Sequence, residues 1–272
     1  MILLAFVTLY PMLYVFFSSI SLPSKLLTHT GLLLFPQGFQ TEAYRMVFMN
    51  PMISTGYLNT IFYLVFGLFL NMLITMLAAY ALSRQGLYFK KFFSLMIIFT
   101  MFFSGGLVPL FLQVQSYGLL NSRLALILPS AMAAYNLIIM RTGFEAVPIS
   151  LEESAKLDGA NHMQICFRIV LPLSLPVLAV IGLYYGVYHW NAWYHALIFL
   201  NDSKLYPLQL VLRGILIENQ TDGMLTESGM KEQLGEAIKY AAIIVATLPI
   251  VCVYPFLQRF FVKGIMIGSV KG

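Results

Sequence analysis

The sequence predicts an all-α membrane protein with six transmembrane helices, and three observations support this fold class. First, 60% of the 272 residues are hydrophobic and only 10% are charged, whereas soluble domains carry about 25% charged residues. Second, the chain contains long stretches without any charge, the longest from Met46 to Ser83. Third, no Asp or Glu lies inside any of the six apolar stretches. A soluble fold could not bury this much apolar surface, and a helix satisfies its own backbone polar groups inside a bilayer.

The six predicted helices follow the order of the apolar stretches, each at about the length that crosses 30 Å of hydrocarbon. They cover Met1–Ile20, Leu58–Leu82, about Phe92–Leu112, Leu124–Met140, Leu173 to about Leu197, and Tyr240–Leu257. The first lacks the basic leader and cleavage site of a signal peptide, so we interpret it as a span. Its abrupt start suggests a short cytoplasmic leader upstream. Residues 21 to about 56 and 198–235 are expected to form polar loops.

Loop charges predict the orientation of the helices. One set of alternate loops holds nine Lys and Arg residues with four acids, whereas the other set holds seven of each. Cytoplasmic loops carry the excess of Lys and Arg. The first set, which includes the loop after the fourth helix and the C-terminus, is therefore expected to be cytoplasmic.

The stretch Glu145–Pro176 carries the most informative pattern in the chain. Ser150 and Glu153 are spaced as a capping box, which predicts a helix over Leu151–Asp158. Gly159 suits the left-handed position that ends such a helix. A helix of about two turns is unstable alone in water. We therefore expect it to dock on another structure or, alternatively, to lie as an amphipathic loop on the membrane surface.

The predicted helix has two faces. One face is shared by four residues at helical spacing, of which the alanine is small enough for another backbone to approach: Leu151, Ser154, Ala155 and Asp158. Glu152 and Lys156 are expected to form an exposed ion pair. Downstream, Asn161 and Gln164 can cap a second helix, which Pro172 ends or kinks.

These residues carry a resemblance to a known family. Glu153-Ser154-Ala155, Gly159 and Ile169-Val170-Leu171-Pro172 stand at the spacing of the EAA loop of membrane subunits of bacterial ABC importers. That family usually has Ala where this chain has Ser154. Leu157-Asp158-Gly159-Ala160 and the closing Gly268-Ser269-Val270-Lys271-Gly272 resemble more specifically the sugar-importer branch, of the maltose-permease type.

The resemblance implies six helices of the type I ABC importer kind in the bacterial inner membrane, with a cytoplasmic coupling helix that docks on a separate ATPase. The coupling residues that it implies are Leu151, Glu152, Glu153, Ser154, Ala155, Leu157, Asp158, Gly159 and Ala160. The tail residues that would contact the ATPase are Gly268, Ser269, Val270, Lys271 and Gly272. The implied partners are a second homologous permease subunit, two ATPase subunits that bind ATP and Mg²⁺, and an external solute-binding protein.

The resemblance and the apolar stretches together predict that the chain is divided into three parts. Residues 1–56 hold the first helix and an external loop. Residues 57–262 form a five-helix core that includes the coupling loop 145–172. Residues 263–272 form a cytoplasmic tail, which its glycines should keep non-helical.

The sequence contains no motif that would make the chain an enzyme. It has no GxxxxGK[ST] phosphate loop, no catalytic constellation and no Cys/His spacing for a metal, and Cys166 and Cys252 are not expected to pair. The net charge of +5 is too modest and dispersed to suggest nucleic acid. The alternative function is a self-contained channel or secondary carrier for a small polar solute. It is disfavoured because such carriers usually retain an intramembrane carboxylate.

Aromatic residues concentrate in the fifth predicted helix. Tyr184, Tyr188 and Asn191 lie on one face at helical spacing, and we predict that together with Asn59 they line a pathway for a carbohydrate substrate. The alternative for the outer aromatics, Trp193–His195, is a belt at headgroup level.

Three further features bear on substrate and packing. Residues 190–209 resemble permeases for larger oligosaccharides, among them alginate-type fragments. Gly182 and Gly186 predict close packing of the fifth helix on a neighbour. Asn71 predicts a hydrogen bond between helices.

Overall fold

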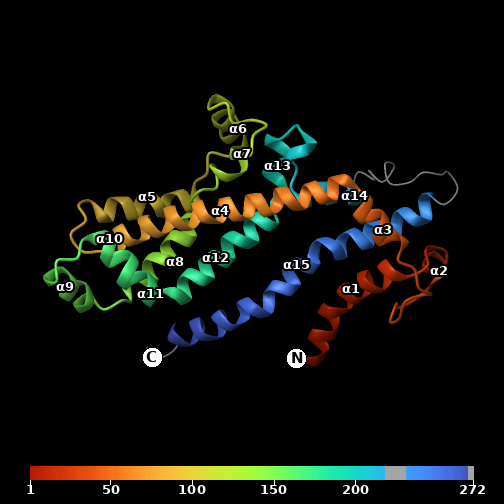
Figure 1. The fold of residues 1–272 in the computed structure, drawn as a ribbon, viewed down its shortest axis with the longest axis horizontal. Helices are drawn as coiled ribbons and strands as arrows, with labels where there is room; N and C mark the ends of the chain where they lie inside the picture. Colours follow the sequence, from red (N-terminus) through yellow and green to blue (C-terminus); the bar gives the residue numbers. More distant parts are fainter. Residues whose placement is uncertain (218–230, 269–272) are drawn as a thin grey trace. The chain divides into compact units, whose positions relative to one another are not determined.

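The computed structural model describes residues 1–217 and 231–268, and within these ranges it contains helices and no strand (Figure 1). The all-α prediction is confirmed for this part of the chain. The chain divides into two compact units. Unit 1 comprises Met1–Thr60, Ala192–Leu197 and Asn201–Val253, and unit 2 comprises Ile61–Asn191, Ile198–Leu200 and Tyr254–Gly272.

Unit 1 begins with the first predicted helix, α1 (Ile2–Ile20). It continues with α2 (Pro23–Thr28), α3 (Glu42–Met49), η2 (Ser203–Leu205) and α14 (Leu208–Ile217), together with parts of α4 and α15. The prediction of a polar loop over residues 198–235 is wrong where α14 lies, because most of α14 is buried. Gly56 explains the close packing, since a Cβ there would stand 3.1 Å from the Leu208 Cα.

Unit 2 holds the remaining helices. They are α5 (Lys90–Phe102), α6 (Leu107–Ser116), α7 (Leu124–Ile127), α8 (Ala134–Glu145), α9 (Ile149–Leu157), α10 (His162–Ile165), the π-helical turn η1 (Cys166–Val170), α11 (Leu171–Leu173) and α12 (Leu175–Trp190). A short helix, α13 (Tyr194–Phe199), belongs partly to each unit. The core of unit 2 includes Phe144, Ile165 and Ile181, which are fully buried.

The second and sixth predicted helices are present and longer than expected. α4 (Pro51–Ser83) has 33 residues and contains the whole predicted span, a length of about 50 Å at 1.5 Å per residue. α15 (Lys231–Gly268) contains the predicted span Tyr240–Leu257. The prediction that the tail from residue 263 is non-helical is wrong as far as Gly268, because a glycine lowers helix propensity by only about 1 kcal/mol in an already formed helix. Residues 269–272 lie outside the described residues.

The third, fourth and fifth predicted helices are not continuous. α5 and α6 meet at 114°, where Gly106 adopts a φ of +85° that an ordinary helix excludes. α7 and α8 are separated by residues 128–133, where Pro129 has no backbone N–H to continue the helical hydrogen bonds. α12 ends at Trp190, three residues before α13. Among the described residues, two helices can cross a membrane alone, or four spans are possible if each of two bent pairs is one.

Candidate functional site

The helix α9 occupies the predicted position of the coupling helix, with different ends. It begins at Ile149 after Pro148 and ends at Leu157, and Gly159 has the expected left-handed φ of +80°. The capping box predicted from Ser150 is wrong, because no side-chain bond caps this helix. Since the helix starts one residue before Ser150, that serine lies inside the first turn, where its side chain is not placed to cap.

One face of α9 packs against the rest of unit 2. Glu152 is 6% exposed and Ala155 is 8% exposed, and Ala155 belongs to the core that includes Phe144. The prediction that Glu152 is exposed is therefore wrong, and the close approach that Ala155 permits is made by this chain's own core. Of the other predicted coupling residues, Ala160 is half-buried and six are exposed, namely Leu151, Glu153, Ser154, Leu157, Asp158 and Gly159.

Arg84, directly after α4, holds the buried face of α9. Its Nη1 donates to Glu152 Oε2 at 2.7 Å, its Nη2 donates to the Phe144 carbonyl at 2.6 Å, and its Nε donates to Ser83 Oγ at 3.0 Å. Lys156 Nζ lies 2.9 Å from the other carboxylate oxygen of Glu152. Burial by itself raises the pKa of Glu152, but the bonds from Arg84 and Lys156 outweigh it and hold that pKa below its ordinary 4.5. The carboxylate therefore stays ionised near neutral pH.

A second carboxylate stands close to this ion pair. Glu145, at the end of α8, accepts from Lys90 at 3.3 Å and from Arg141 at 3.0 Å. Its side chain is 37% exposed, against 7% for Glu152. Burial by itself raises its pKa, and the hydrogen bonds from Arg141 and Lys90 lower it below the ordinary value. The two acids, together with Arg84 and Lys90, line a polar pocket of about 430 Å³ at this end of unit 2.

The loop that follows α9 forms the second predicted cap. Asn161 Oδ1 accepts from the Gln164 backbone and Gln164 Oε1 accepts from the Asn161 backbone, both at 2.9 Å, so this capping box is confirmed. The predicted break near Pro172 is also present. It falls at Ser174, where the helical segment that contains Pro172 and α12 meet at 86°.

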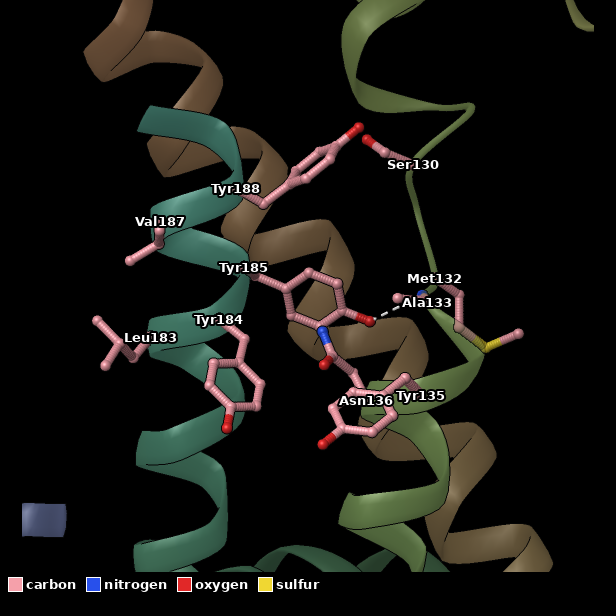
Figure 2. A pocket seen from close by; sticks show the side chains of 10 residues that line it. All are labelled: Ser130, Met132, Ala133, Tyr135, Asn136, Leu183, Tyr184, Tyr185, Val187 and Tyr188. Carbon is pink, nitrogen blue, oxygen red and sulfur yellow. Dashed lines mark hydrogen bonds between the residues drawn. The ribbon is translucent and has the colours of Figure 1, made fainter. Parts of the chain in front are cut away.

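A cavity of about 810 Å³ lies in unit 2 between α12 and residues 130–136, with α4 behind them in the view of Figure 2. It is lined by Ser130, Met132, Ala133, Tyr135, Asn136, Leu183, Tyr184, Tyr185, Val187 and Tyr188. None of the ten side chains carries a formal charge at neutral pH. Hydroxyl groups, one amide and apolar surface together suit a hydroxyl-rich ligand.

Two of the four predicted pathway residues line this cavity and two do not. Tyr184 and Tyr188 face it from α12 (Figure 2). Asn191 is exposed, and its amide donates to the Val187 carbonyl of its own helix at 2.9 Å. Asn59 belongs to unit 1, where it is 2% exposed and donates to the backbone of residues 204 and 206, so its role there is structural. The prediction that Asn191 and Asn59 join the two tyrosines is not supported by this arrangement.

Sequence reasoning missed the wall opposite α12. Tyr135 faces Tyr184 with ring centroids 6.4 Å apart and an interplanar angle of 30°. Asn136 follows in the same turn and is buried. Asn136 within an apolar run, shortly after Pro129, was the available indication that this segment is not an ordinary lipid-facing helix.

The cavity walls are attached to α4. Asn71 Oδ1 lies 2.6 Å from His189 Nε2, and its amide donates to the Ser130 carbonyl, which confirms the predicted bond between helices. Thr75 Oγ1 lies 2.7 Å from the Tyr185 hydroxyl, which also accepts from a backbone N–H at 3.0 Å (Figure 2).

The two glycines predicted to pack closely on α12, Gly182 and Gly186, have different surroundings. Gly182 faces the sulfur of Met72 on α4, whereas a Cβ at Gly186 would meet open space within this chain. Close packing inside the chain is therefore supported for Gly182 alone.

Comparison with known proteins agrees with this architecture. The family described as "Binding-protein-dependent transport system inner membrane component" matches residues 71–267. "Polygalacturonan/rhamnogalacturonan transport system permease protein YtcP" of Bacillus subtilis (strain 168) is 42% identical over 100% of this chain and 96% of that protein. "Protein LplC" of the same organism is 41% identical over 98% and 90%.

A solved structure agrees as well. The chain matches one from the crystal structure of a bacterial ABC transporter involved in the import of the acidic polysaccharide alginate. The TM-score is 0.88 at 33% identity, over 95% of this chain and 92% of that chain. The chain therefore belongs to the family of binding-protein-dependent transport system inner membrane components, as a permease subunit of the carbohydrate ABC importer kind.

Proposed function

We propose that this chain forms one half of the membrane pathway of an ATP-driven importer and couples to a separate ATPase through α9. The observation that carries the proposal is the division of α9 into two faces. One face is fixed to unit 2 by Glu152 and Ala155, while the opposite face presents Glu153 and Leu157, the last 90% exposed, and Leu151 is exposed at the edge of the buried face. A short helix held in this way offers a rigid, partly apolar surface, as a docking site requires.

The proposed importer contains a second homologous permease subunit, two ATPase subunits and an external solute-binding protein. ATP and Mg²⁺ bind to the ATPase subunits, since this chain has no phosphate loop and is not itself the ATPase. We place α9 and the C-terminus on the cytoplasmic side and retain six crossings, formed by α1, α4, α5–α6, α7–α8, α12 and α15. The excess of Lys and Arg in the cytoplasmic loops supports this orientation.

We further propose that the cargo is an oligosaccharide, with alginate-like and galacturonate oligomers as the first candidates. The tyrosine pair Tyr135 and Tyr184 offers aromatic surface for the C–H faces of a sugar ring, and Ser130, Asn136 and Tyr188 offer hydroxyl and amide partners. The names of the relatives support the same class of cargo.

Transport assays with the complete complex in proteoliposomes test this proposal. A panel of labelled galacturonate, alginate and neutral oligosaccharides should include one that is taken up only when the ATPase subunits, ATP and the binding protein are present. Uptake that is undiminished without the ATPase subunits would instead support a self-contained channel or carrier, and would refute the proposal.

The docking face can be tested separately. Leu157→Asp should reduce co-purification of the ATPase subunits, because it places a charge in the proposed interface. Leu32→Asp is the matched control, since Leu32 is also exposed, at 68%, and lies in unit 1 far along the chain from α9. Equal co-purification with both variants would argue against α9 as the docking site.

A further inference from the structure

The two sites in unit 2, the buried face of α9 and the cavity, are both bonded to the same helix. We propose that the part of α4 within unit 2 is the stiff link that carries a displacement of α9 to the cavity walls, and that Arg84 is the positioning residue that fastens α9 to it. The inference rests on the proposed coupling of α9 to an ATPase, and it names the path by which that coupling reaches the cargo.

The polar contact at the α9 end of the link is made by a buried guanidinium, beside the core packing of Ala155. Arg84 is 9% exposed and donates to three elements at once, reaching Glu152 on α9, the Phe144 carbonyl on α8 and Ser83 on α4. Its guanidinium also lies 5.3 Å from the Tyr80 ring centroid. A planar fork with several donors held in this way fixes both direction and distance, which a point charge on a flexible stem does not. α9 therefore cannot shift without moving the end of α4 or breaking this cluster.

The body of the link is one uninterrupted helix. α4 runs as a single α-helix to Ser83 and has no proline after its first residue, Pro51. Sharp kinks in helices arise mainly at proline or at local insertions into the hydrogen-bond ladder. From Arg84 back to Thr75 and Asn71 the helix spans about 14 Å and about 20 Å at 1.5 Å per residue. Over these lengths the helix can transmit an axial or tilting movement without local refolding.

The cavity end of the link attaches to both walls. Asn71 bonds to His189 on α12 and to a carbonyl of residues 130–133. Thr75 bonds to the hydroxyl of Tyr185, which reaches across the cavity from α12 to a backbone N–H of residues 130–133 (Figure 2). Asn71, Thr75 and His189 are each 1% exposed or less. Movement of α4 therefore displaces the two walls through polar contacts that no water competes for.

A cysteine placed in the cavity can report movement of the cavity walls, and this measurement does not require the cargo to be identified. Met132 lines the cavity and is 42% exposed, so Met132→Cys in a Cys252→Ser background provides an accessible thiol, while Cys166 is buried. In the complete complex, Mg·ATP with vanadate should change the rate of maleimide labelling by about fivefold or more, the lower range of typical couplings between sites. Arg84→Gln should reduce this change to less than about twofold, while the ATPase subunits still co-purify.

Arg141→Gln is the matched control. Arg141 forms an Arg–Glu ion pair with Glu145 at 3.0 Å at the same end of unit 2, with no bond to α9, so the response to nucleotide should persist. A full response in Arg84→Gln overturns the inference and leaves the proposed function standing. Absence of any response in the parent complex overturns the proposed function itself.

A second variant covers the case in which Arg84→Gln does not assemble. Thr75→Val keeps the shape of the side chain and removes only the bond to Tyr185 at the far end of the link. Loss of the nucleotide response in an assembled Thr75→Val complex supports the link, and an unchanged response overturns it.

Discussion

Replacing Glu152 with Gln tests how strongly the buried ion pair holds α9. The side chains of Glu152 and Arg84 are 7% and 10% exposed and their charged atoms are 2.7 Å apart. Removal of one partner of such a pair costs about 3–5 kcal/mol, because the other charge stays buried. Arg84 keeps the Phe144 carbonyl as a partner, so we expect the lower end, about 3 kcal/mol. For a chain of this size, that corresponds to a Tm lower by about 6–12 °C.

A thiol-reactive fluorogenic dye measures this change in detergent. Cys166 is 1% exposed in the core of unit 2 and reacts when that core opens, and Cys252→Ser removes the exposed thiol. Glu145→Gln is the control, because its carboxylate is 37% exposed and a pair of this kind contributes about 1 kcal/mol at most. A Tm loss for Glu152→Gln no larger than that for Glu145→Gln would refute the conclusion that the Arg84 pair anchors α9.

Of three further predictions, the first is measured by circular dichroism, because a thiol dye reacts with the thiolate and is inactive in acid, and the other two by the same dye assay. The pKa of Glu152 is lowered in the folded protein, so its stabilising effect is complete above pH 4.5 and is lost as the pH falls through the lowered pKa; the Tm difference between the parent and Glu152→Gln should therefore shrink in acid. Gly67→Ala should cost about 1–3 kcal/mol, because its Cβ would overlap an imidazole ring of α12, whereas Gly186→Ala meets open space and should not destabilise. Asn161→Ala should cost about 1 kcal/mol through loss of the capping box, and Ser150→Ala, which removes no cap, should have no measurable effect.

The candidate site was predictable where it depends on neighbouring residues. Gly159 and the capping box of Asn161 with Gln164 were found correctly from spacing, because each involves residues within one helical turn. The exposure of Glu152 was predicted wrongly. Its burial depends on Arg84, which lies 68 residues away in the sequence, and no local pattern reveals that contact.

The cavity residues likewise divide into those that local sequence patterns predicted and those that depend on contacts between distant segments. Tyr184 and Tyr188 were identified because they share one face of a helix, which periodicity determines. Asn59 is equally polar and lies in an apolar stretch, yet it is used to hold backbone carbonyls in unit 1. Tyr135 was missed because its position opposite α12 depends on the break between α7 and α8.

The sequence by itself determined that the chain is helical and apolar, and that a left-handed glycine, Gly159, follows the short helix α9. These properties follow from composition, helical periodicity and capping, which are interactions between residues close together in the chain. Only the tertiary structure decided which apolar stretches bend, which face of α9 is buried, and which polar side chains line the cavity. Those outcomes depend on contacts between distant segments, where desolvation and hydrogen bonding select one of several arrangements that local patterns allow.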